Sequence, residues 1–492
     1  MYMKVIVPAV FFLLLVVSES AFAQKMTMEE AISTARSQSV LALEARASFI
    51  SDYWAWRSYL GSRLPMVSVY GEIGSFDRSL SLVQRVETGE MLYTTTFNMQ
   101  NSLGLKIDQN LTATGGTLTL YSNLNRLDQF GTNSGTTWYA QPVTLSYSQP
   151  LFSYNRFKWD KKISPKEYEK ARRVYMESME DVTLEAVEYF FDLMEAKVNH
   201  DVSLANHDKT SRMLRIARAR MNLGTVTRDE YLQLELRQLK DSIAIQECSM
   251  LLRKAQMQFN SLVGFDESHE VEPVLDDRLP DITIDYNQVL EKCAGNSSFY
   301  LQNEINELNA ESAIAQAKAN RGLTMQLYAK FGLSNSAGSL SRTYSNLLDQ
   351  EIVGLSFSIP IFDWGAGKGR VKKAQAAAEV IRAQVEQSEN DKRISLFNSV
   401  GQFNNQRRQC TVSSRANVIA QERYTLVMEK FRRGKATVND LNTARSESDE
   451  AQRQYISDIY GFWRYYYTLR KLTLFDFIEG HDIDVSFKEM TE

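Results

Sequence analysis

The chain has 492 residues, a formal net charge of −4, 24% charged residues and only 8 prolines. This charge balance argues against a nucleic-acid-binding protein, which would carry a basic stripe. The length would permit two or three domains, and the scarcity of proline favours long uninterrupted helices.

The first 23 residues are expected to form a secretory signal peptide. Lys4 precedes an apolar run over 5–17, and the small residues Ala21 and Ala23 provide a cleavage site before Gln24. The run is too short for a membrane span, which needs about 20 residues. No later segment reaches that length without charges. We therefore predict an exported protein whose membrane-embedded part, if it has one, consists of strands.

An internal repeat organises the rest of the chain. Three landmarks recur at one offset, 360 − 150 = 210; the pairs are Pro150 and Pro360, Gly224 and Gly434, and Phe265 and Phe475. Such a repeat indicates two copies of one structural unit. We expect a first repeat over 24–266, a second repeat over 267–476 and a C-terminal tail over 477–492.

The first repeat carries an insert. Gly74 matches Gly332 at 332 − 74 = 258, so 258 − 210 = 48 extra residues lie within 75–149. The insert is rich in Gly, Ser, Thr and Asn, and 114–117 predicts a turn. The flanking segments 103–111 and 118–124 could pair as a hairpin. They either extend the sheet or form an external loop.

Several segments alternate strictly between apolar and polar residues, as strands do. The apolar positions are Val143, Leu145 and Tyr147; Met325, Leu327, Ala329 and Phe331; and Val353, Leu355, Phe357 and Ile359. Alternation over about 9–11 residues is typical of a membrane barrel, with lipid outside and water inside. The alternative is a half-buried strand of a soluble sandwich, and the signal peptide and helical remainder favour the barrel.

Long helical patterns follow Pro150 and Pro360. Heptad seams run through Leu232, Leu236, Leu239 and Ile243, and through Val371, Ala374, Ala378, Ile381 and Val385. At 1.5 Å per residue, helices over 166–222 and 370–433 would be about 85 and 95 Å long. Helices of this length must pack beside other helices, as in a coiled coil.

Closing the predicted sheet requires more than one chain. Each chain offers four to six strands, and an open edge in lipid leaves several kcal/mol of unmet hydrogen bonding per backbone group. The barrel must therefore be shared between chains. If the insert stays outside, three chains of four strands give twelve.

The duplicated elements resemble the TolC family of outer-membrane efflux proteins. The resemblance rests on the strand-to-helix elements 149–152 and 359–365, on the tip turns 222–227 and 433–440, and on the repeat itself. It implies a trimeric twelve-strand barrel above a long helical tunnel, girdled by an equatorial domain. It also implies a periplasmic adaptor and an inner-membrane pump as partners.

The resemblance places a periplasmic aperture near the tip turns. The family closes its tunnel with rings of aspartate; Asp440 falls on one such position, and Glu230 is its counterpart in the first repeat. Thr443 and Ala436 depart from the pattern, since the family has aspartate and arginine there, so any gate is weaker or differently built. The alternative role for Glu230 and Asp440 is helix capping, because each lies three residues after a threonine.

The tip turns are also expected to dock the adaptor. Their residues are Leu223, Gly224, Thr225, Arg433, Gly434 and Lys435. Each glycine follows a long helix and precedes a threonine-led cap, which predicts the left-handed conformation that ends a helix. An apolar side chain beside two cations offers a docking edge; a merely solvated turn is the alternative.

These patterns together predict a mixed α and β membrane protein. We expect a trimeric TolC-like β-barrel with about four strands per chain, surrounded by membrane lipid and continuing into a long α-helical coiled-coil tunnel in the periplasm. The expected function is an outer-membrane exit duct of a tripartite efflux pump or a type I secretion system. The alternative is a structural coiled-coil envelope protein without conductance. No nucleophile elbow or metal motif predicts an enzyme, a cofactor or a metal site.

Overall fold

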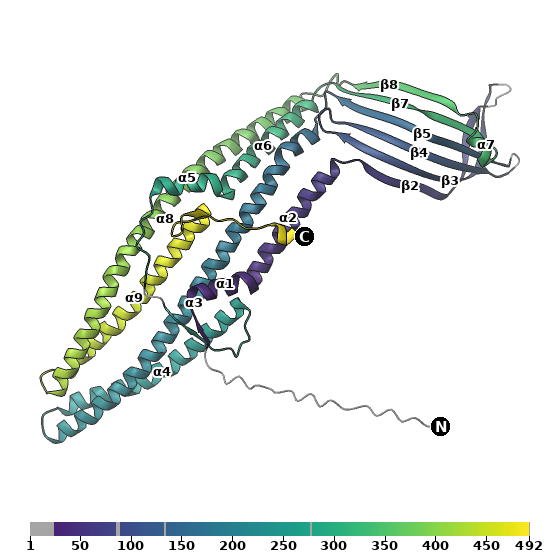
Figure 1. The fold of residues 1–492 in the computed structure, drawn as a ribbon. Coiled ribbons are helices and arrows are strands. Elements are labelled where there is room, and N and C mark those ends of the chain that lie inside the picture. Colours follow the sequence, from purple (N-terminus) through teal and green to yellow (C-terminus); the bar gives the residue numbers. More distant parts are fainter. Residues whose placement is uncertain (1–23, 85–88, 132–133, 276–277, 492) are drawn as a thin grey trace, which may run out of the picture. The chain divides into compact units, whose positions relative to one another are not determined.

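The computed structural model describes residues 24–84, 89–131, 134–275 and 278–491. The expected signal peptide lies outside these residues. The chain forms two compact units, each built from separate parts of the sequence (Figure 1). The first unit comprises the residues up to Arg46, Met176–Gly295 and Ser395–Val485, and the second comprises Ala47–Tyr175, Asn296–Ile394 and the residues from Ser486.

The second unit contains a sheet of six antiparallel strands in sequential order. The strands are β2 (Met66–Gln84), β3 (Met91–Leu111), β4 (Gly116–Gln129), β5 (Gly135–Leu151), β7 (Thr324–Ala337) and β8 (Leu348–Ser358). Both β3 and β4 come from the insert, which therefore extends the sheet. The expectation of about four strands per chain is corrected to six, because alternation continues through the insert and its strands pair with β2 and β5.

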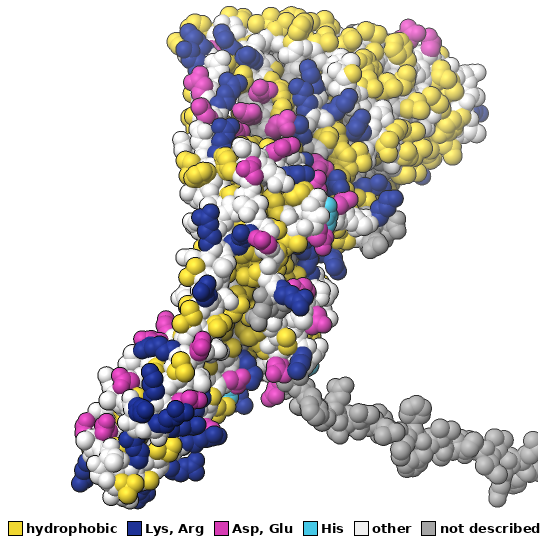
Figure 2. All heavy atoms as spheres, turned by 60° about the vertical axis from the view of Figure 1, so that its left-hand side comes forward, with side chains coloured by type: hydrophobic (Ala, Val, Ile, Leu, Met, Phe, Trp, Pro, Cys, Tyr) yellow, Lys and Arg dark blue, Asp and Glu magenta, His cyan; other side chains and the backbone are white. Residues whose placement is uncertain are grey.

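The two faces of the sheet differ in chemistry. Period-two pairing places alternate residues of every strand on one face, and this face is apolar across all six strands. Its exposed members are Val67, Val69, Leu103, Leu105, Leu120, Leu145, Phe331, Leu333, Val353, Leu355 and Phe357. Figure 2 shows hydrophobic side chains gathered over the sheet at the upper right. An apolar face of this extent marks a surface that another phase or molecule covers.

Four helices connect directly to the sheet. The helices α2 (Val40–Ser62) and α6 (Ser298–Ala319) lead into β2 and β7, whereas α3 (Arg156–Asn222) and α8 (Ala366–Arg432) follow β5 and β8 (Figure 1). The helix α3 begins ten residues earlier than expected and continues through Pro165. Among the described residues, no helix is both long and apolar enough to cross a bilayer.

The first unit is built around two helical hairpins that repeat one another. The far part of α3 turns into α4 (Arg228–Val263), and the far part of α8 turns into α9 (Val438–Thr473). All four helix boundaries recur at an offset of 210, since 366 − 156, 432 − 222, 438 − 228 and 473 − 263 are each 210. The repeat predicted from sequence is thus a repeat of helices with equal lengths.

Shorter elements complete the fold. In the first unit, α1 (Met28–Gln38) and α5 (Tyr286–Asn296) are accompanied by a parallel pair of β1 (Gln24–Met26) with β6 (Val271–Pro273) and an antiparallel pair of β9 (Phe475–Asp476) with β10 (His481–Asp482). The second unit adds α7 (Leu340–Thr343) and α10 (Lys488–Thr491).

Candidate functional site

The two tip turns share one backbone geometry. Gly224 and Gly434 have φ angles of 73° and 74°, in the left-handed region expected from sequence. In the first turn, the Thr225 amide donates to the carbonyl of Arg220 at 3.0 Å, and the Gly224 amide donates to that of Met221 at 2.9 Å. This pair of bonds is a Schellman motif, which satisfies the last carbonyls of a helix.

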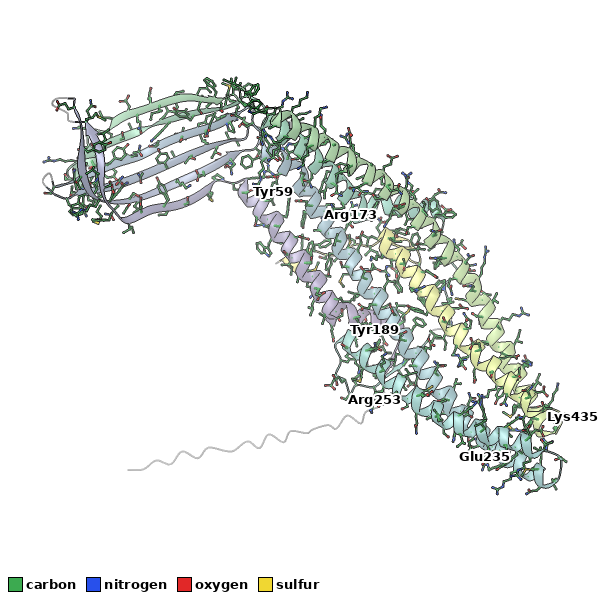
Figure 3. The ribbon with its side chains drawn as sticks, turned by 180° about the vertical axis from the view of Figure 1, so that it is seen from behind. Tyr59, Arg173, Tyr189, Glu235, Arg253 and Lys435 are labelled. Atoms are coloured by element: carbon green, nitrogen blue, oxygen red, sulfur yellow. The ribbon has the colours of Figure 1, made fainter. Side chains whose placement is uncertain are left out.

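The second turn repeats the motif at the same offset. The Lys435 amide donates to the carbonyl of Lys430 at 2.8 Å, and the Gly434 amide donates to that of Phe431 at 3.0 Å. Figure 3 labels Lys435 at the far end of the α8–α9 hairpin. The neighbouring turn exposes Leu223, with 78% of its surface accessible. An apolar side chain and a cation are therefore presented by the two tips.

The acidic residues proposed for the aperture both cap helices. The Thr227 amide donates to Glu230 Oε2 at 2.9 Å, and the Glu230 amide donates back to Thr227 Oγ1 at 3.2 Å. The corresponding distances between Thr437 and Asp440 are 3.0 and 3.1 Å. The backbone and hydroxyl bonds from Thr437 hold the pKa of Asp440 below its usual value. Asp440 is therefore a carboxylate at neutral pH, exposed at the start of α9.

A small core joins the two tips. Its buried members are Met213, Ala217, Val226, Leu234, Phe431, Val438 and Leu441, contributed by both hairpins. Arg220 reinforces this joint: its guanidinium donates to the carbonyl of Phe431 at 3.1 Å and lies 5.8 Å from the ring centroid of that residue. The sequence does not predict this contact, because residues 211 positions apart leave no local pattern.

A buried ion pair also ties the hairpins together. Asp241 of α4 and Arg445 of α9 are 4% and 7% exposed, and their closest nitrogen–oxygen distance is 2.9 Å. Thr210 of α3 donates to Asp241 at 2.6 Å. Burial raises the pKa of Asp241, but the bonds from Arg445 and Thr210 outweigh it and leave that pKa below the usual value. Sequence reasoning missed this network.

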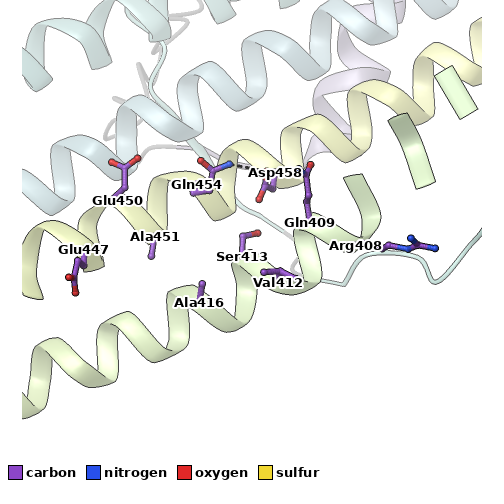
Figure 4. Close-up of a pocket in the computed structure, with 10 residues that line it drawn as sticks. All are labelled: Arg408, Gln409, Val412, Ser413, Ala416, Glu447, Glu450, Ala451, Gln454 and Asp458. Carbon is purple, nitrogen blue, oxygen red and sulfur yellow. Dashed lines mark hydrogen bonds between the residues drawn. The ribbon is translucent and has the colours of Figure 1, made fainter. Parts of the chain in front are cut away.

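A groove of about 590 Å³ lies between α8 and α9 (Figure 4). Val412, Ala416 and Ala451 supply apolar lining, and three acidic residues, Glu447, Glu450 and Asp458, lie along the same groove. The Asp458 carboxylate already accepts hydrogen bonds from Gln454 at 3.0 Å and Gln406 at 3.2 Å. These amides engage the Asp458 carboxylate within the α8–α9 hairpin.

Residues 297–473, in the second repeat, match the family model described as outer membrane efflux protein. A search of the curated proteins finds no match. Three solved outer-membrane proteins share the fold: Campylobacter jejuni CmeC (TM-score 0.66, 13% identity, 94% of this chain and 89% of that one), Vibrio cholerae VceC (0.63, 13%, 93% and 97%) and OprN (0.63, 15%, 91% and 89%).

These matches bear on both repeats. The family model covers the helices α6, α7, α8 and α9 together with the strands β7 and β8. The structural matches extend over more than nine-tenths of the chain and therefore include most of the first repeat. The resemblance expected from sequence is confirmed in the fold: the chain has the fold of TolC-like outer-membrane channels, and its second repeat matches the outer membrane efflux protein model.

Proposed function

We propose that the chain is one protomer of a trimeric exit channel in the outer membrane, serving a tripartite efflux pump or a type I secretion system. The observation that carries this proposal is the outer-membrane-channel fold, shared over at least 91% of the chain. Such a channel conducts its cargo passively, from a periplasmic pump assembly to the exterior. Each chain supplies helices for a periplasmic conduit and strands for the membrane.

Uncovered apolar seams support the trimer. The helix α4 exposes large apolar residues at heptad spacing, namely Leu232, Leu236, Leu239, Ile243, Met250 and Met257. The helix α8 exposes a second seam at Val412, Ile419 and Leu426, spaced by seven residues. Heptad seams form when helices pack as coiled coils. We infer that neighbouring copies of this chain cover both seams.

The aperture proposal rests on Glu230 and Asp440. Both carboxylates lie at helix starts next to the tips, and both are engaged by their own capping threonine. Capping uses only part of the lone-pair capacity of a carboxylate. Three copies of each around a narrow axis would therefore still present negative charge and favour cations.

The docking proposal rests on the tip turns themselves. Leu223, Gly224 and Thr225 form one turn, and Arg433, Gly434 and Lys435 form the other. The shared core beneath them holds the two turns as one surface. We propose that this surface binds a periplasmic adaptor, which connects the channel to an inner-membrane pump.

Detergent extraction followed by sedimentation and planar-bilayer recording tests the proposal. We expect a particle of three chains that inserts and conducts ions. A structural coiled-coil envelope protein would give the assembly without conductance. A folded, strand-containing monomer would contradict the shared barrel, because its sheet edges would face detergent unpaired.

A further inference from the structure

The six strands of the sheet are three copies of one hairpin. In β2, β4 and β7 an apolar–polar–apolar triplet precedes a tyrosine, as Val67-Ser68-Val69-Tyr70, Leu118-Thr119-Leu120-Tyr121 and Met325-Gln326-Leu327-Tyr328. The returning strands share a second pattern, as Leu103-Gly104-Leu105-Lys106, Val143-Thr144-Leu145-Ser146 and Val353-Gly354-Leu355-Ser356. The insert thus repeats the hairpin that the second repeat contains once.

Strand register shows that the three hairpins are structurally equivalent. In each hairpin the tyrosine faces the same position of the returning strand; the pairs are Tyr70 with Gly104, Tyr121 with Thr144, and Tyr328 with Gly354. The preceding apolar pairs are Val69 with Leu105, Leu120 with Leu145, and Leu327 with Leu355. A slip of one residue would exchange the two faces. All three hairpins therefore direct matching side chains to matching faces.

The β3–β4 connection is fastened to the helix-side base of the sheet. Asn155, at the start of α3, donates to the carbonyls of Thr112 and Ala113 at 3.1 and 3.3 Å. Gln149 of β5 donates to the carbonyl of Thr114 at 2.8 Å. This turn is thus part of the base, where the other strands of the sheet continue into helices.

The polar face of the sheet also runs through the inserted strands. Thr119 of β4 donates to Asp108 of β3 at 2.6 Å, and Lys106 lies 2.9 Å from the same carboxylate. Lys330 of β7 lies 5.5 Å from the ring centroid of Tyr121. On the opposite face, Leu105 and Leu120 continue the exposed apolar surface. A hairpin outside the sheet would need neither a continuous polar face nor a continuous apolar face.

We propose that the membrane part of the assembly is an eighteen-strand barrel of nine equivalent hairpins, three from each chain. This inference rests on the proposed trimeric channel. The outer strands of the sheet, β2 and β8, would each pair with another copy of this chain, and lipid would cover the apolar face. Six strands in sequential antiparallel order end with β8 running opposite to β2, so the junction between copies is antiparallel as well.

The added hairpins widen the pore. Strands about 4.8 Å apart and tilted by about 40° occupy about 6.3 Å of circumference each. Eighteen strands then give a backbone diameter of about 36 Å, against about 24 Å for the twelve strands implied by family resemblance. Barrels of this strand number leave an aqueous channel. The narrowest passage for cargo would consequently lie outside the membrane.

Cysteine labelling in intact outer membranes tests the position of the inserted strands. Only Cys248 needs replacement by Ser, because Cys293 and Cys410 are buried and burial raises the pKa of Cys410 to about 12. Leu120→Cys in β4 is compared with its equivalent Leu327→Cys in β7. Thr119→Cys and Gln326→Cys serve as matched controls on the polar face.

In the eighteen-strand barrel, both leucine variants are protected from a water-soluble maleimide and contact nitroxide-labelled lipid, whereas both polar-face variants react with the maleimide. Reaction of Leu120→Cys alone overturns the inference and leaves the proposed channel intact. Reaction of both leucine variants overturns the channel as well, since the sheet would then lie in water.

Imaging of the purified full-length assembly along its symmetry axis supplies the strand count. We expect three chains and eighteen strands. Twelve strands, with β3 and β4 outside the wall, would overturn the inference while preserving the trimer. An assembly of any other number of chains would overturn both proposals.

Discussion

The two repeats agree in their helices and differ in their strands. The helices α3 and α4 reappear as α8 and α9 with identical lengths, whereas the first repeat supplies four strands to the sheet and the second supplies two. A helix of a coiled coil must match its neighbours along its whole length, so an insertion disturbs every later contact. A whole hairpin preserves alternation and antiparallel order, so a sheet accepts it. The helical part therefore constrains length more strictly.

The two tip turns share a backbone conformation but differ in the side chains that surround them. A Cβ on Gly434 would lie 3.0 Å from the Arg220 guanidinium, whereas a Cβ on Gly224 would meet no atom within 4 Å. The buried pair of Asp241 and Arg445 has no duplicate, because the positions 210 residues away hold Ala451 and Glu235. The repeat thus conserves backbone shape, while the contacts that join the hairpins occur once.

The largest expected effect comes from blocking both tips at once. Gly224→Val with Gly434→Val places β-branched residues at left-handed positions, costing roughly 1 kcal/mol or more at each. This distorts the docking surface without unfolding helices of this length. We expect normal amounts of trimer in the outer membrane and loss of export, measured by cargo accumulation. Export at the wild-type rate would show that the adaptor binds elsewhere, and loss of trimer would show that the glycines serve assembly.

The unduplicated ion pair predicts a large loss of stability. Asp241→Asn leaves the buried Arg445 with only Asp449, 3.7 Å away, as a counter-charge, so we expect a loss of up to about 3–5 kcal/mol. Thermal unfolding should show a clear fall in Tm, whereas Asp229→Asn, an exposed change on the same helix, should leave Tm unchanged. Asp241→Leu combined with Arg445→Met should recover most of the loss. If the double variant is as unstable as Asp241→Asn, the broken ion pair is not the source of the lost stability.

The same pair predicts a pH dependence. Because the pKa of Asp241 is lower in the folded protein than in the unfolded chain, its contribution is fully present above the unfolded value of about 3.9. That contribution is lost as pH falls through the folded value. The free energy of unfolding should therefore fall less between pH 6 and pH 3 in Asp241→Asn than in the wild type. Parallel curves would contradict this assignment.

A smaller effect separates the two glycines. Gly224→Ala and Gly434→Ala share the cost of the left-handed backbone, about 1 kcal/mol. Gly434→Ala also displaces Arg220 from the Phe431 carbonyl, adding roughly 0.5–1 kcal/mol. Denaturant unfolding should resolve this difference in the free energy of unfolding between the two variants. The difference should vanish when both are made in an Arg220→Ala background. A difference that persists without Arg220 would assign it to another contact.

The smallest expected effect concerns ion selectivity. Asp440→Asn removes one charge per chain near the tips, so cation selectivity in a planar bilayer should fall. Glu230→Gln is the matched change in the first repeat. Equal reductions would place both carboxylates on the conducting path. Unchanged selectivity and unchanged block by divalent cations in Asp440→Asn would leave that residue with capping alone.

The helices and tips could be predicted from sequence because their signals are local. Glycine after a long helix and threonine before an acidic residue specify chain reversal within a few positions. The contacts of Arg220 and Asp241 are not predictable in this way because they join distant segments. The 210-residue repeat relates equivalent positions and does not say which residues touch. Family resemblance also drew attention to Asp440 rather than to the buried pair nearby.

The strand number was wrong for a different reason. Alternation within the insert is compatible with both an extended sheet and an external hairpin, and the family pattern favoured about four strands. A signal was nevertheless present. Tyr121 follows the same apolar–polar–apolar pattern as Tyr70 and Tyr328. It lies only 121 − 70 = 51 residues after Tyr70, a spacing unlike the offsets of 210 and 258 that relate the two repeats.

The fastened turn at Thr112–Gly115 has a consequence for symmetry. The proposed trimer contains six helical hairpins and nine strand hairpins, and the only rotation common to rings of six and nine is three-fold. Each chain has four strand-to-helix crossings, at β2, β5, β7 and β8, and one strand pair that reverses without entering a helix. The two helical repeats are equal in length but connect to different numbers of strands, four in the first repeat and two in the second. The proposed assembly would therefore have three-fold and not six-fold symmetry, even though its helical repeats are equal in length.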